Sequence, residues 1–126
     1  MLLSEYLSDL VKVIDEYSKT NYIVNFELKT DFRTGKIGII RGSVAFSDNS
    51  KLIFTEYLDL RFKIEKLSYS FHYQKEDSAL IFRYDNALHK PAVDFAGHKH
   101  LSNGKVVPAE PPAFNQVLSE VIDLLL

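Results

Sequence analysis

The sequence predicts an α+β fold, in which a helix precedes an antiparallel sheet of about five strands and a second helix ends the chain. Three observations carry this prediction. Near both ends of the chain, apolar residues recur every three to four positions, as on one face of a helix. Between these segments, apolar and polar residues alternate in short runs, as in strands with one buried face. Short turns separate the runs, which favours a meander of neighbouring antiparallel strands.

The bulk composition is that of one globular domain spanning residues 1–126. The chain is 46% hydrophobic and 25% charged, with a net charge of −2. It contains no cysteine, which excludes disulfides, thiolate zinc sites and cysteine nucleophiles. The N-terminus lacks the basic region of a signal peptide, and the apolar runs are shorter than the ~20 residues of a membrane span. We therefore expect a cytoplasmic protein without a membrane partner.

The two predicted helices follow from their apolar stripes. In the first helix Ser4 is the expected N-cap, and Pro111-Pro112 is expected to open the last one. The first stripe comprises Leu3, Tyr6, Leu7, Leu10, Val13, Ile14 and Tyr17, and the last comprises Phe114, Val117, Leu118, Val121, Ile122 and Leu125.

Between the helices we predict five strands and then a long loop. The strands are expected over Tyr22–Lys29, Ile37–Phe46, Lys51–Arg61, Lys66–Lys75 and Ala79–Asp85. Residues 86–112 show no periodicity and hold all four prolines of the chain. A loop of this length inside a domain is usually functional or mobile. We expect Glu56 and Asp59, on the third strand, to form structural ion pairs.

The hairpin of the fourth and fifth strands predicts a polar face. If Gln74 lies opposite Ala79, one face carries three cross-strand pairs: His72 with Ile81, Ser70 with Arg83, and Ser68 with Asp85. The aromatic residues of both strands then point to the opposite face, toward the helices. The polar face leads directly into the long loop.

Residues 82–100 gather the side chains that a site for RNA cleavage needs. Cleavage through the RNA 2′-hydroxyl requires a base, an acid and a cation, but no metal or cofactor. Histidine exchanges protons near neutral pH, and arginine can hold a phosphate with two hydrogen bonds. The predicted catalytic residues are His89, His98, His100, Arg83, Tyr84 and Asp85, and the predicted substrate-binding residues are His72, Asn86, Lys90 and Lys99.

Three other readings of the same residues stay open. Asp85, His89, His98 and His100 form a nitrogen and oxygen ligand set that suits zinc or manganese, which would make the protein a metal-dependent phosphodiesterase or phosphotransferase. The loop could instead bind RNA or a protein without catalysis. It could also be a polar surface loop with incidental histidines.

The stretch FRYDN at residues 82–86, the His89-x-Pro91 motif and the HKH motif at residues 98–100 resemble the TumE family of toxins. The strand KLSYSFHYQ at residues 66–74 is also similar to that family. The sequence departs from the family pattern at three places. Leu88 stands where proline is common, Lys90 replaces a second histidine, and Ala96-Gly97 replaces the proline-histidine that often precedes HKH.

The resemblance implies the toxin of a type II-like toxin–antitoxin system that acts on RNA, encoded beside a helix-turn-helix antitoxin that neutralises it. The element order is also similar to that of barnase/RelE-type ribonucleases, which is an analogy of fold alone. An uncovered edge strand or the leucine-rich last helix could mediate a homodimer.

Overall fold

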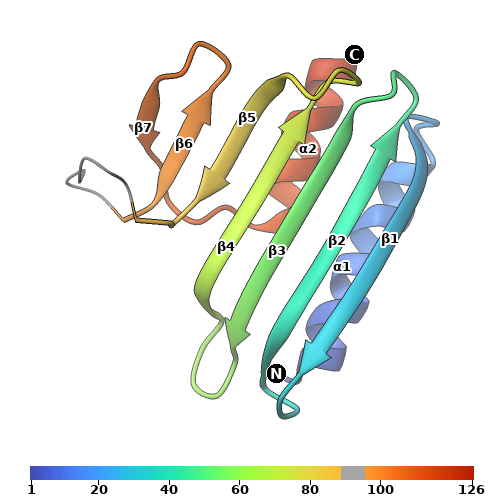
Figure 1. The fold of residues 1–126 in the computed structure, drawn as a ribbon. Helices are drawn as coiled ribbons and strands as arrows, with labels where there is room; N and C mark the ends of the chain where they lie inside the picture. Colours follow the sequence, from blue (N-terminus) through green and yellow to red (C-terminus); the bar gives the residue numbers. More distant parts are fainter. Residues whose placement is uncertain (89–95) are drawn as a thin grey trace.

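The computed structural model describes residues 1–88 and 96–126 (Figure 1). Two helices, α1 (Leu3–Ser18) and α2 (Phe114–Leu125), flank a run of strands. The strands are β1 (Ile23–Phe32), β2 (Ile37–Phe46), β3 (Lys51–Asp59), β4 (Glu65–Gln74), β5 (Leu80–Asp85), β6 (His98–Leu101) and β7 (Val106–Pro108). The helices and the five longer strands lie within a few residues of their predicted bounds. The α+β class and the antiparallel sheet are therefore confirmed.

The described strands form one antiparallel sheet in the order β1-β2-β3-β4-β5-β6-β7, so each strand pairs with the next one along the chain. The prediction of about five strands was wrong, because the expected long loop over residues 86–112 contains β6 and β7. These strands are 4 and 3 residues long, too short for their alternation to be recognised. Strand β6 pairs with β5 and β7 pairs with β6, which extends the sheet beyond the histidine motif.

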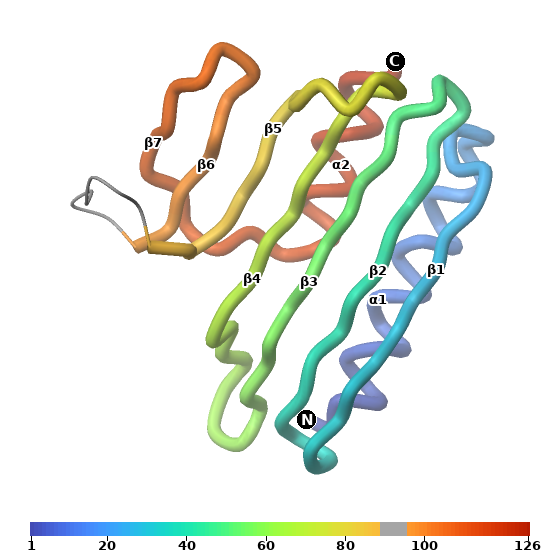
Figure 2. Tube along the Cα trace, viewed as in Figure 1, coloured from blue at the N-terminus to red at the C-terminus, as the bar shows by residue number. Residues whose placement is uncertain are grey.

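Both helices lie behind the sheet in Figure 1, and the Cα trace in Figure 2 shows the same arrangement. The alternation of each strand explains this: in β3, Leu52, Phe54 and Leu58 are buried against the helices, while the residues between them face the other way. The apolar stripe of each helix buries against this face, as predicted. No described element packs on the opposite face, which we call the open face.

The helix starts differ from the prediction by two or three residues. The N-cap of α1 is Leu2 rather than Ser4, and the Leu2 N–H donates to the Glu5 carboxylate over 2.9 Å. Helix α2 has Ala113 as its N-cap, so Pro111 and Pro112 precede the helix instead of opening it. In both helices the side chain at the third helical position, Glu5 or Gln116, accepts a hydrogen bond from the backbone N–H of the N-cap residue.

A buried ion pair ties α1 to the sheet. Glu56 is fully buried, accepts a hydrogen bond of 2.9 Å from the Tyr6 hydroxyl and lies 2.8 Å from Lys66 Nζ. Lys66 also donates to the carbonyl of Pro112, just before α2. Asp59 pairs with Arg61 over 2.8 Å. Structural ion pairs at Glu56 and Asp59 are therefore confirmed.

Candidate functional site

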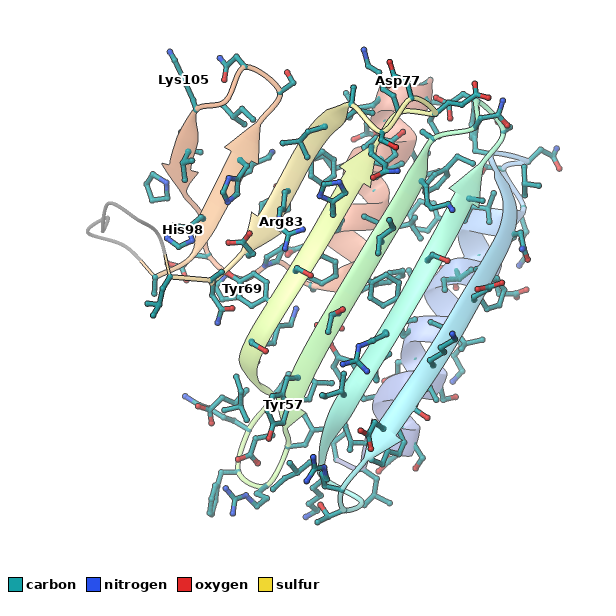
Figure 3. The ribbon with its side chains drawn as sticks, in the orientation of Figure 1. Tyr57, Tyr69, Asp77, Arg83, His98 and Lys105 are labelled. Atoms are coloured by element: carbon teal, nitrogen blue, oxygen red, sulfur yellow. The ribbon has the colours of Figure 1, made fainter. Side chains whose placement is uncertain are left out.

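The centre of the sheet brings several predicted site residues together on the open face. His72 of β4 lies opposite Arg83 of β5, and Arg83 lies opposite His100 of β6. Asp85 of β5 lies opposite His98. Because paired residues of neighbouring strands share a face, these five side chains form one group, which we call the Asp85 cluster. Figure 3 shows Arg83 and His98 at this part of the sheet.

The predicted hairpin register was wrong by two residues. Gln74 pairs with Leu80, because the register shifts between Tyr73 and Gln74. The irregularity lies beside the turn, where Ser78 adopts a positive φ of 70°. An offset of two residues keeps every side chain on its face, since side chains in a strand alternate with a period of two. His72, Arg83 and Asp85 consequently share the open face as predicted, but with new partners.

Asp85 is the centre of the cluster. Its side chain is only 6% exposed, and its two oxygens contact three basic groups. Arg83 Nε lies 2.7 Å from Oδ2, His100 Nε2 lies 3.3 Å from Oδ2, and His98 Nδ1 lies 3.4 Å from Oδ1. Burial raises the pKa of Asp85, but the Arg83 hydrogen bond and the charges of His100 and Arg83 outweigh it, so the pKa lies below its ordinary value. The carboxylate therefore stays ionised.

The basic groups of the cluster differ in exposure. The His98 side chain is 3% exposed, that of His100 is 24% exposed and that of Arg83 is 36% exposed. His100 and Arg83 can thus meet a ligand on the open face, while His98 packs beneath the surface.

His72 extends the cluster toward β4. Its Nδ1 lies 3.3 Å from Arg83 Nη1, and its Nε2 lies 3.1 Å from Gln74 Oε1. Burial and the charge of Arg83 lower the pKa of His72 below its usual value, although the Gln74 hydrogen bond acts in the opposite direction. A neutral His72 accepts a hydrogen bond from Arg83, which fixes the orientation of the guanidinium group.

Two predicted site residues lie on the other face of the sheet. The Tyr84 hydroxyl donates to Glu120 Oε1 of α2 over 2.6 Å, and Lys99 Nζ lies 2.7 Å from Glu120 Oε2. Burial and the hydrogen bond to Glu120 raise the pKa of Tyr84. Tyr84 and Lys99 therefore hold α2 on the sheet and do not meet the Asp85 cluster.

The remaining predicted residues divide into two groups. Asn86 caps the end of β5, where its Oδ1 accepts from the Tyr69 N–H over 3.1 Å and its Nδ2 donates to the Leu67 carbonyl over 3.2 Å. His89 and Lys90 lie outside the described residues.

Sequence reasoning missed a cavity of about 450 Å³ beside the cluster, lined among others by Lys66, Tyr69, Asn86, Gly97 and Glu110. The alternation of β4 assigned Tyr69 to the core. The cavity forms because residues 108–111 return beside the end of β5, and that return depends on the β6–β7 pairing that the sequence did not indicate.

The described residues contain no group of three or more His, Asp or Glu side chains arranged to hold one metal ion. The alternative ligand set for zinc or manganese includes His89, which lies outside this part of the chain. The described members of that set, Asp85, His98 and His100, contact one another but are not arranged to hold one metal ion by themselves.

Comparison with known proteins decides the family. The family model described as Toxin TumE matches residues 10–125. The chain belongs to the TumE toxin family. A toxin of this family implies an antitoxin as its partner. No curated protein and no solved structure matches the chain, so the analogy with barnase/RelE-type ribonucleases stays a prediction. Among the described helices, none has the length and apolar character needed to cross a membrane.

Proposed function

We propose that this TumE family member is a cytoplasmic toxin that cleaves RNA as a metal-independent endoribonuclease. The observation that carries the proposal is the Asp85 cluster, in which one buried carboxylate orients Arg83, His98 and His100 on a face that neither helix covers. The arrangement supplies proton-transfer groups and a cation within one hydrogen-bonded unit, as phosphodiester cleavage requires. The fold analogy with barnase/RelE-type ribonucleases is part of this proposal.

The reaction needs no outside reagent. A base takes the proton of the RNA 2′-hydroxyl, and the 2′-oxygen forms a bond to phosphorus. The bond from phosphorus to the 5′-oxygen breaks, and an acid gives that oxygen a proton. The products are a 2′,3′-cyclic phosphate and a free 5′-hydroxyl. Negative charge grows on the non-bridging oxygens, where a nearby guanidinium group stabilises the transition state.

The exposures suggest different roles for the basic residues. His100 is the proton-transfer residue, because its imidazole reaches the open face. Arg83 binds the phosphate with the part of its guanidinium group that does not contact Asp85. His98 is a positioning residue: it lies beneath the surface and fixes the Asp85 carboxylate. His72 positions Arg83. His89 is the predicted second proton-transfer residue.

The test is cleavage of a mixed-sequence RNA by purified protein with and without EDTA. We expect EDTA-resistant cleavage that falls about 10²–10⁴-fold in His100→Ala and about 10²–10³-fold in Arg83→Ala. Arg41→Ala is the matched control, because Arg41 is an exposed arginine on the same face of β2 and has no contact with Asp85. Folded wild-type protein that leaves RNA intact, or an equal loss in Arg41→Ala, would contradict the proposal.

A metal-dependent reaction is the second candidate. Asp85, His98 and His100 are the described members of the predicted zinc or manganese set, and His98 and His100 each place a ring nitrogen within 3.4 Å of the same carboxylate. This candidate predicts cleavage that EDTA abolishes and that added Zn²⁺ or Mn²⁺ restores. RNA binding that survives His100→Ala, without turnover by wild type, would favour the non-enzymatic reading.

We further propose two partners. One is a helix-turn-helix antitoxin, which the family resemblance implies. The other is a second copy of the chain, paired through the edge strand β1. On β1, Val24 is 69% exposed and Phe32 is 39% exposed. An antiparallel pairing centred on Leu28 would place Val24 opposite Phe32 and Glu27 opposite Lys29, twice each by symmetry.

Charge reversal tests the homodimer. Lys29→Glu would place two glutamates opposite each other and should give a monomer by light scattering, whereas wild type should be a dimer. The double variant Glu27→Lys/Lys29→Glu restores opposite charges and should restore the dimer. A wild-type monomer at high micromolar concentration, or a dimer that ignores both changes, would contradict this pairing.

A further inference from the structure

The cavity of about 450 Å³ lies where β5 ends and β6 begins. Its volume falls in the ~300–1,000 Å³ range of small-molecule sites. The walls combine the apolar side chains of Ala96, Pro108, Ala109 and Pro111 with the polar side chains of Lys66, Tyr69, Asn86 and Glu110. A cavity that combines apolar walls with a few polar groups is the usual composition of a small-molecule site.

Tyr69 carries the clearest sign of a ligand. The residue is 5% exposed, and its hydroxyl is buried with no hydrogen-bond partner among the described residues. The hydroxyl lies 3.0 Å from the position that a Cβ on Gly97 would occupy, so it points at the cavity wall that Gly97 forms. Burial of an unpaired hydroxyl is unfavourable, which makes such a group exceptional in a folded protein. A ligand that accepts a hydrogen bond there would supply the missing partner.

The charges around Tyr69 determine which hydrogen-bonding groups a ligand must carry. Burial and the negative charges of Asp85 and Glu110 raise the pKa of Tyr69, so the hydroxyl stays protonated and can donate. Lys66 is already held by Glu56 and by the Pro112 carbonyl. Glu110 is exposed, and its carboxylate oxygens accept hydrogen bonds. The cavity therefore presents one donor and one carboxylate acceptor to the edge of a bound ring.

The cavity adjoins the Asp85 cluster along the backbone. Asp85 belongs to the cluster and Asn86 to the cavity, and in the same way His98 belongs to the cluster and Gly97 to the cavity. Figure 3 shows the labelled side chains of Tyr69, Arg83 and His98 at this end of β5. Tyr69 lies on the helix side of the sheet, because it pairs with Glu56, so a nucleotide with its base in the cavity would carry its sugar and phosphate around the end of β5 to the cluster.

The geometry points to a nucleobase subsite in this cavity, selective for guanine, that places the adjoining phosphate of an RNA strand at the Asp85 cluster. The inference rests on the proposed function for the role of the phosphate, whereas the base pocket stands on the cavity itself. Guanine offers two neighbouring N–H donors, at N1 and N2, to a carboxylate, and its O6 accepts from a hydroxyl. Adenine, cytosine and uracil do not offer that combination on one edge.

The test is calorimetric binding of GMP, AMP, CMP and UMP to the full chain. We expect GMP to bind most tightly. Tyr69→Phe should weaken GMP binding about tenfold, as the loss of one buried hydrogen bond does. Glu110→Gln should weaken GMP binding to a similar extent and remove the preference over AMP. Tyr73→Phe is the matched control. It removes a buried hydroxyl from the same strand, but this hydroxyl forms a 2.8 Å hydrogen bond with Ser50 and does not line the cavity.

The outcomes separate the subsite from the proposed reaction. If the subsite and the proposed reaction both exist, His100→Ala should abolish cleavage and leave GMP binding unchanged. GMP binding that depends on Tyr69 in a protein without cleavage would support the subsite and contradict the reaction. Cleavage without preference 3′ or 5′ of guanine, equal binding of all four nucleotides, or GMP binding unaffected by Tyr69→Phe would overturn the subsite.

Discussion

The buried acidic side chains on the two faces of the sheet have different sets of partners. On the helix-covered face, acids and their partners match: Glu56 meets Tyr6 and Lys66, and Glu120 meets Tyr84 and Lys99. Each set joins a helix to the sheet. On the open face, the single carboxylate of Asp85 meets three basic groups, all on β5 and its neighbour β6.

The difference indicates different purposes. A matched pair between two elements fixes their relative position, and breaking it leaves an uncompensated buried charge. An excess of basic groups around one acid fixes no other element, because β5 and β6 are already joined by backbone hydrogen bonds. It leaves part of the Arg83 guanidinium group and the His100 imidazole toward solvent, where a phosphate can bind. Changes on the covered face should consequently alter stability, and changes on the open face should alter activity.

The largest stability effect is expected at Lys66. Lys66→Ala leaves Glu56 fully buried without its cation, which should lower the free energy of unfolding by about 3–5 kcal/mol in urea titrations. Lys99→Ala is the control: that pair with Glu120 is partly exposed and should contribute no more than about 1 kcal/mol. Equal effects of the two substitutions would contradict a special role for the buried pair.

The next effect concerns Asp85 and should appear in activity. Asp85→Asn keeps the shape of the side chain but removes the charge that orients Arg83, His98 and His100. We expect kcat for RNA cleavage to fall about 10²-fold, equivalent to about 2.7 kcal/mol, with thermal unfolding changed by only a few degrees. A variant as active as wild type would show that the cluster is not catalytic. Loss of folding would place Asp85 with the structural ion pairs instead.

Two tyrosines on the helix-covered face differ in whether their hydroxyls have hydrogen-bond partners. Tyr84→Phe removes a hydrogen bond of 2.6 Å to a carboxylate and should lower the free energy of unfolding by about 1.5–3 kcal/mol without changing kcat. Tyr69→Phe removes a buried hydroxyl that has no partner in the described part of the chain, and should raise the free energy of unfolding by about 1 kcal/mol. Urea titration of both variants checks the opposite signs. A Tyr69→Phe protein less stable than wild type would mean that this hydroxyl has a partner in the free protein.

The sequence was sufficient to predict the elements whose residues follow a local periodic pattern. The stripes of both helices and the alternation of strands such as Ile37–Phe46 depend on neighbouring residues, and these elements were predicted nearly at their observed bounds. The sharing of one face by His72, Arg83 and Asp85 was also predictable, since it survives an error of two residues in register.

The rest depends on contacts distant in sequence. Strands β6 and β7 are too short to show a pattern. Strand β6 forms on the edge that β5 offers, and β7 forms on the edge that β6 offers. The placement of Lys99 on the helix side follows from its pairing with Tyr84, which places both next to Glu120 of α2. A cluster of polar residues in sequence was thus divided between two faces, and only the pairing of strands could reveal the division.

The smallest expected effect is the pH dependence that His72 contributes. Its folded-state pKa is lowered, so between that value and the unfolded value of about 6.5 the unfolded chain binds more protons at this position. The free energy of unfolding therefore rises with pH through this window; the gain is complete above about 6.5 and is lost below the folded pKa. Because the imidazole is partly exposed, we expect a few tenths of a kcal/mol.

Urea titrations at pH 5 and pH 7.5 measure this contribution. His72→Gln should be less pH-dependent than wild type by that amount, while the dependence due to other groups remains in both proteins. The hydrogen bond with Gln74 opposes the lowering of the His72 pKa by burial and by the charge of Arg83. Gln74→Ala should therefore lower the His72 pKa further and increase the pH dependence. Arg83→Gln should decrease it. A pH dependence that the Arg83 change leaves intact would show that burial alone sets the protonation of His72, and that the open face does not couple β4 to the Asp85 cluster.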